Sequence, residues 1–220
     1  MEILQPILEI LLINILLSGD NALVIAMASR NLSIDLQARA IRWGTFGAIG
    51  LRILFTFLMI HLLKMPFIEL VGGVLLLVVA YKLLVDNHET DHIKSGDSLQ
   101  EAVSIIIFAD VLMSLDNVLA IAAVAENNVL LIITGIVLSI PIILTASELI
   151  LKLIKKYPVI IFFGSGLLAW TAGEMILKEG IVQHFVEHKG IPPIALLISV
   201  TFLVLLIGGI KRKWNKKGEE

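Results

Sequence analysis

The chain has 220 residues, of which 58% are hydrophobic and 16% are charged, and its mean hydropathy is +0.96. Soluble domains average roughly 45–50% apolar and about 25% charged residues, so this composition excludes an ordinary soluble protein. The net charge of -2 argues against a nucleic-acid-binding protein, which would carry a basic face. The absence of cysteine excludes disulfides, thiolate metal sites and cysteine nucleophiles.

Seven segments are long and apolar enough to cross a bilayer, which takes roughly 20 mostly apolar residues per helix. They cover approximately residues 7–28, 40–63, 66–85, 99–125, 129–151, 158–177 and 192–210. We expect the first segment to be retained, because the residues before it hold Glu2 and no basic residue, unlike a signal peptide. The sequence therefore predicts an all-α, polytopic membrane protein.

The basic residues predict its orientation, because cytoplasmic connections carry an excess of Lys and Arg. With the C-terminus inside, thirteen basic residues fall on the cytoplasmic side and only Lys64, Lys178 and Lys189 fall outside, while Arg52 lies within the second segment. We therefore expect a multi-pass protein of a bacterial plasma membrane, with its N-terminus outside and its C-terminus in the cytoplasm.

A polar motif occurs inside the first apolar segment and again, 96 residues later, inside the fourth. The matching pairs are Ser18 and Ser114, Asp20 and Asp116, and Asn21 and Asn117, and Asn14 corresponds to Asp110. An ionisable side chain within a membrane span is costly, so by default it indicates a functional site.

The third and sixth segments also match, at an offset of 92 residues, through Pro66 and Pro158, Gly72 and Gly164, and Ala80 and Ala172. A repeating unit of three spans is odd in number, so its second copy must enter the membrane the other way up, which is typical of transporters. We predict a 3+3 inverted repeat plus one extra C-terminal helix. Its parts would be residues 1–98 with a cytoplasmic loop, residues 99–178, and an extra helix with a basic tail in residues 179–220.

The paired motif offers carboxylate, amide and hydroxyl oxygens, a ligand set that suits Mg²⁺, Ca²⁺ or Mn²⁺ better than zinc or copper. Two Asp side chains would neutralise one divalent cation. The alternative is that the Asn and Ser side chains only form hydrogen bonds between helices. On an unbroken helix, moreover, Asp20 and Asp116 would lie about 120° away from the Asn and Ser stripes beside them.

Other polar residues have two interpretations each. Arg52 requires an anion, for which Asp20, Asp110 and Asp116 are candidates, or else its side chain extends to the membrane surface. Glu174 is a candidate proton or ion relay. The loop with His88 and His92 either binds metal or is a solvated linker.

Several glycines fall inside the predicted spans. We expect them to permit close helix packing rather than to form a ligand site. They are Gly44, Gly47, Gly50, Gly72, Gly73, Gly164 and Gly166.

The stretches Ser-Gly-Asp-Asn-Ala-Leu-Val-Ile-Ala at 18–26 and Leu-Asp-Asn-Val-Leu-Ala-Ile-Ala at 115–122 resemble the two signature segments of the TerC family of integral membrane proteins, in its shorter seven-span branch. The resemblance covers residues 1 to about 210. It implies manganese efflux, because bacterial members are associated with that activity, and it implicates Asp20, Asn21, Asp116 and Asn117 as the metal site.

We therefore expect a secondary transporter that exports a divalent cation, Mn²⁺ above all, through a mid-membrane site formed by the paired motifs. Asp110, Ser18, Ser114, Glu174 and Arg52 are candidates for further positions on the ion pathway. No ATP-binding loop pattern is present, so an ion gradient would supply the energy. The alternative is a non-transporting membrane module that assembles with partners in metal or envelope-stress handling.

Neither interpretation requires an enzyme or a permanently bound cofactor. The expected partners are the divalent ion as substrate, the lipid bilayer, and further copies of the chain or other membrane proteins.

Overall fold

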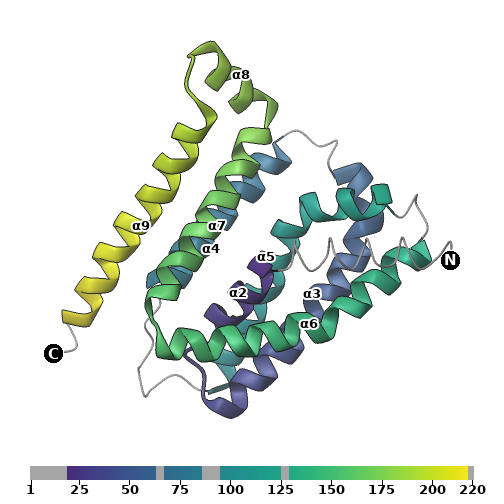
Figure 1. The fold of residues 1–220 in the computed structure, drawn as a ribbon, viewed down its shortest axis with the longest axis vertical. Helices are drawn as coiled ribbons and strands as arrows, with labels where there is room; N and C mark the ends of the chain where they lie inside the picture. Colours follow the sequence, from purple (N-terminus) through teal and green to yellow (C-terminus); the bar gives the residue numbers. More distant parts are fainter. Residues whose placement is uncertain (1–18, 63–66, 86–94, 125–128, 218–220) are drawn as a thin grey trace. The chain divides into compact units, whose positions relative to one another are not determined.

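The computed structural model describes residues 19–62, 67–85, 95–124 and 129–217. These residues form eight α-helices and no strand (Figure 1). An all-helical chain agrees with the composition, because a helix satisfies its own backbone hydrogen bonds in a medium without water. Asn14, Ser18, Pro66 and the loop with His88 and His92 lie outside the described residues.

Within the described residues, four stretches of helix are long and apolar enough to span a membrane. They are Ile68–Val85, Ile133–Lys156, Val159–Lys178 and Pro193–Trp214, with mean hydropathies of 2.3, 2.0, 1.6 and 2.6. They correspond to the third, fifth, sixth and seventh predicted spans. The exact count of seven stays a prediction.

The first compact unit holds four helices, α2 (Gly19–Ser29), α3 (Ile34–Leu62), α5 (Ser95–Val124) and α6 (Val129–Lys156). Helix α3 packs along α5, and α2 packs against both α6 and α5 (Figure 1). The predicted close approach at two glycines is confirmed. A Cβ atom at Gly44 would lie 2.7 Å from Ile106 Cδ1, and one at Gly47 would lie 2.5 Å from Ile107 Cδ1. A Cβ at Gly50, by contrast, would meet no atom within 4 Å.

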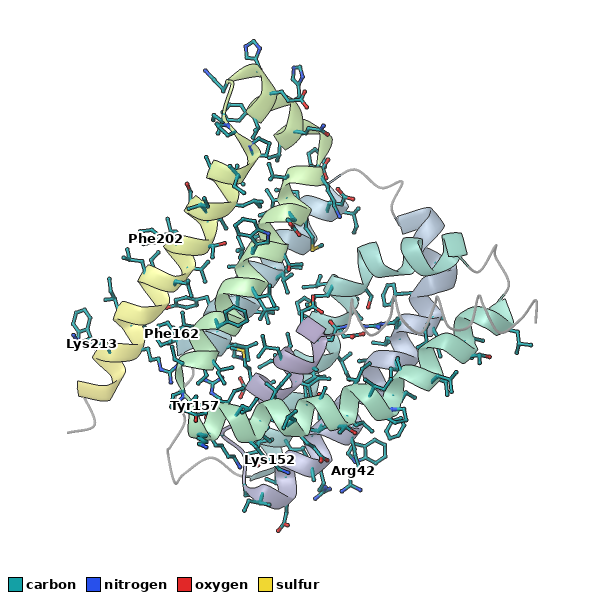
Figure 2. All side chains as sticks on the ribbon, viewed as in Figure 1. Arg42, Lys152, Tyr157, Phe162, Phe202 and Lys213 are labelled. Carbon is teal, nitrogen blue, oxygen red and sulfur yellow. The ribbon has the colours of Figure 1, made fainter. Side chains whose placement is uncertain are left out.

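The second unit holds α4 (Ile68–Val85), α7 (Val159–Lys178), α8 (Gly180–His188) and α9 (Pro193–Lys217). Helix α4 packs along α7, and α9 packs against both (Figure 1). Gly73 permits the first contact, because a Cβ there would lie 2.7 Å from the backbone oxygen of Ala172. Phe202, on the side of α9 that faces away from α7, is 63% exposed, as expected for a surface that meets lipid (Figure 2).

Helices from the two predicted repeats are interleaved within these units. The third helices of the two predicted copies, α4 and α7, pack together. The first helix of each copy packs against the second helix of the other, α2 against α6 and α5 against α3. Such reciprocal contacts are what an intertwined duplication would produce, although the repeat itself and its boundaries at residues 98 and 178 stay predictions.

Three helix boundaries differ from those expected. Helix α3 begins at Ile34 rather than near residue 40, α5 begins at Ser95 rather than 99, and α6 extends to Lys156. Each extension is polar, so it continues a helix beyond the apolar stretch from which the span was predicted. The connection between the sixth and seventh predicted spans contains the short helix α8.

Candidate functional site

A buried ion pair joins α3 to α5 in the first unit. The guanidinium of Arg52 donates a hydrogen bond from Nη2 to Asp110 Oδ1, and its Nε donates to Ser114 Oγ at 2.9 Å. The Ser114 hydroxyl in turn donates to the backbone oxygen of Asp110. Asp110 and Ser114 lie one helical turn apart on α5, so one face of that helix supplies two partners of the guanidinium.

These groups are almost completely removed from solvent. The exposed fractions are 1% for Arg52, 8% for Asp110 and 0% for Ser114. Arginine keeps its charge in proteins, so a buried guanidinium needs an anionic partner and hydrogen-bond acceptors to offset the loss of hydration. Of the two interpretations of Arg52, the structure therefore shows the buried ion pair, and of its three candidate partners it shows Asp110.

Asp20 belongs to α2, which packs against both α3 and α5. It occupies the first described turn of α2, and one of its carboxylate oxygens accepts a hydrogen bond from the backbone N–H of Asn21 at 2.8 Å. Helices α2, α3 and α5 thus bring two carboxylates and one guanidinium into the same part of the first unit.

Asn21, the next residue of the motif, is only 2% exposed. Neither its Oδ1 nor its Nδ2 has a hydrogen-bond partner among the described residues. A buried polar group without a partner costs about 1–3 kcal/mol, so this amide is a poor choice for helix packing alone. Its oxygen has the chemistry of a ligand for a hard divalent cation.

The second copy of the motif lies within α5, which is an unbroken helix from Ser95 to Val124. Asp116 and Asn117 belong to it, but their side chains lie outside the described ones. The Asp110 and Ser114 stripe of this helix faces Arg52 of α3.

Glu174 belongs to the other unit. Its side chain is exposed on α7, where a carboxylate oxygen accepts a hydrogen bond from Trp170 Nε1 at 2.9 Å. Among the residues that the structure describes, no three His, Cys, Asp or Glu side chains are gathered closely enough to hold a metal ion.

Comparison with known proteins identifies the family. Residues 1–219 match the description "Integral membrane protein TerC family". The chain belongs to the TerC family. It is 40% identical over 205 residues to "Uncharacterized membrane protein YjbE" of Bacillus subtilis, which covers 93% of this chain and 94% of that protein. This TerC protein is therefore a multi-pass integral membrane protein.

A second Bacillus subtilis protein, "Uncharacterized membrane protein YceF", is 31% identical over 153 residues, which is 65% of this chain and 59% of that protein. No solved structure matches the TerC chain. The resemblance noted from the two Asp-Asn segments is thereby confirmed at the level of the family.

The role of Ser114 was not predicted. The structure shows that its hydroxyl accepts a hydrogen bond from Arg52 and donates one to the backbone of its own helix, while its place on the ion pathway stays a prediction. The spacing of four residues from Asp110 was the available signal, because side chains at that spacing lie one above the other on a helix.

Proposed function

We propose that the protein is a secondary transporter that exports a divalent metal cation, with Mn²⁺ as its expected substrate. The observation that supports this proposal is the buried Arg52–Asp110 ion pair between α3 and α5, in the unit where α2, which carries Asp20, packs against both of these helices. Ionisable groups held away from the surface of a membrane protein typically mark ion pathways, because they are costly to retain for packing alone.

The ligands in this proposal are oxygen atoms. Asp20 and Asn21 supply a carboxylate and an amide from α2, the amide having no hydrogen-bond partner among the described residues, and Asp116 and Asn117 supply the same pair from the second copy of the motif. Two carboxylates balance the charge of one divalent ion, and neutral oxygens complete its coordination. Asp110, Ser114 and Arg52 form the polar surroundings of this set.

The proposal treats the metal as a transported substrate, so it includes no catalytic residue and no resident cofactor. An ion gradient supplies the energy. The direction is outward, with the N-terminus outside and the basic C-terminal tail in the cytoplasm.

Flux measurements in proteoliposomes test the function. We expect wild-type protein to move Mn²⁺ down an imposed gradient, and Asp20→Asn and Asp116→Asn to reduce the initial rate by at least about tenfold, because each removes one charge from the ligand set. Asp35→Asn is the matched control, since Asp35 is exposed in the first turn of α3 and undergoes the same chemical change.

Folded wild-type protein that moves no Mn²⁺, Ca²⁺ or Mg²⁺ would overturn the proposal and favour a non-transporting membrane module. Equal flux through wild type and both Asp variants would show instead that the paired motif is not the ion site.

A further inference from the structure

The candidate site includes one positively charged side chain, that of Arg52. Arg52 comes from α3, near the middle of a 29-residue helix, and it donates hydrogen bonds to Asp110 and Ser114 of α5. Because its guanidinium cannot release its proton in a protein, this positive charge is permanent. Any cation that approaches the paired motif also meets the field of Arg52, since α2 and α5, which carry the two copies of the motif, both pack against α3.

We infer that Arg52 acts as a tethered cation of the ion site, which neutralises Asp110 so that the transported ion meets the charge of two carboxylates rather than three. This inference rests on the proposed function and deepens it. With Asp116, the three carboxylates and one guanidinium carry a formal charge of −2, which one divalent cation neutralises.

A positive counter-charge at this site would help the ion to be released. A transport site must bind its ion tightly enough to select it and weakly enough to let it leave. Three carboxylates without a counter-charge would hold a divalent ion too strongly, because electrostatic interactions are much stronger away from water. Arg52 therefore sets the affinity, and Ser114 keeps the guanidinium directed at Asp110.

The inference predicts opposite effects for two substitutions. Arg52→Gln removes the positive charge, so the KM for Mn²⁺ should fall by about tenfold or more, and kcat should fall as well because release becomes slow. Asp110→Asn removes one negative charge and leaves Arg52 uncompensated, so KM should rise by a similar factor. In the double variant the two changes cancel in charge, and its KM should lie between those of the single variants.

If the ion pair has a purely structural role, the expected results are different. If Arg52 only joins α3 to α5, each single variant lowers the thermal stability, and the folded fraction of each keeps the wild-type KM. The KM value and its separation from kcat are therefore the decisive readouts, because loss of folded protein reduces the total rate without changing KM.

The experiment measures initial rates of Mn²⁺ flux in proteoliposomes against Mn²⁺ concentration, together with equilibrium Mn²⁺ binding to the purified protein in detergent. Arg52→Lys keeps the charge, so its KM should shift less than that of Arg52→Gln. Arg42→Gln is the matched control, since Arg42 is exposed on the same helix, ten residues earlier, and loses the same charge (Figure 2). Its KM should equal that of wild type.

If Arg52→Gln does not fold, the double variant and Arg52→Lys carry the test, because neither leaves Asp110 buried opposite a neutral group. The inference is supported if the KM is lowest in Arg52→Gln, intermediate in the double variant and highest in Asp110→Asn. Equal KM values in all folded variants, or a higher KM in Arg52→Gln, would overturn it while leaving the transporter proposal intact. Wild-type protein that neither binds nor moves Mn²⁺ would overturn both.

Discussion

Lys155, near the end of α6, donates a hydrogen bond from Nζ to the side-chain oxygen of Gln37 at 2.8 Å, although 118 residues separate them. Gln37 in turn donates from Nε2 to the backbone oxygens of Arg30 and Leu32, in the turn between α2 and α3. One amide thus joins the end of α2, the beginning of α3 and the end of α6. Because these three points meet, they share one side of the membrane, in agreement with the predicted placement of both connections on the basic side.

Replacement of Gln37 by Ala should destabilise the first unit. The side chain is only 6% exposed, and its removal leaves two backbone oxygens and the Lys155 amine without this partner, at a cost of about 1–3 kcal/mol. Thermal unfolding of the purified protein in detergent measures the effect. Gln183→Ala is the control, because the exposed side chain of Gln183 donates a hydrogen bond to Glu187 one turn away in α8, so we expect a loss below about 0.5 kcal/mol. Equal losses of stability in the two variants would show that the hydrogen bonds of Gln37 stabilise the protein no more than the exposed hydrogen bond of Gln183 does.

Gly73→Ala should separate α4 from α7. The added Cβ would lie 2.7 Å from the Ala172 oxygen and 3.2 Å from the Ile176 nitrogen, and these backbone atoms cannot move aside as a flexible side chain can. We expect a loss of about 1–3 kcal/mol from overpacking. Gly50→Ala, on α3, is the matched control, since its Cβ would meet open space, and alanine favours a helix by about 0.5–1 kcal/mol over glycine. The two variants should shift the unfolding temperature in opposite directions, and a shift of the same sign in both would contradict the packing argument.

The chain contains no cysteine, so single introduced cysteines report the orientation without background. Ser33→Cys and Lys189→Cys both lie at exposed positions, before α3 and after α8. If the distribution of basic residues sets the topology, a membrane-impermeant maleimide should label Lys189→Cys on intact cells and Ser33→Cys only after permeabilisation. The reversed pattern would invert the predicted orientation, and labelling of both on intact cells would exclude an odd number of crossings between them.

The sequence predicted the helical class and the need of Arg52 for a buried anion, because both follow from composition and from the cost of burying charge. It could not identify Asp110 as a partner of Arg52, since that depends on which face of α5 packs against α3. Helix α8 was also missed, although its apolar residues Ile181 and Phe185 lie one turn apart, because so short a helix lacks the length of a span. The metal assignment of Asp116 remains a prediction, because only its place in the helix is described.

Asn21→Leu should raise stability and impair transport at the same time. Both polar atoms of the Asn21 amide are buried without a partner among the described residues, so an apolar side chain of similar size should stabilise the folded state by about 1–3 kcal/mol. If the amide oxygen is a ligand of the transported ion, the same substitution should raise the KM for Mn²⁺ about tenfold. Thermal unfolding and flux in proteoliposomes measure the two effects on one preparation.

Thr45→Val provides the matched control for this pair of measurements. The Thr45 hydroxyl is likewise buried, at 1% exposure, and has no hydrogen-bond partner in the described part of the chain. Valine has nearly the same shape, so removal of the hydroxyl should stabilise the protein by a comparable amount and leave the flux unchanged. If Asn21→Leu and Thr45→Val behave alike in both assays, Asn21 is a packing residue and the metal shell must take its neutral oxygen from elsewhere. If they agree in stability and differ in flux, the amide of Asn21 belongs to the ion site.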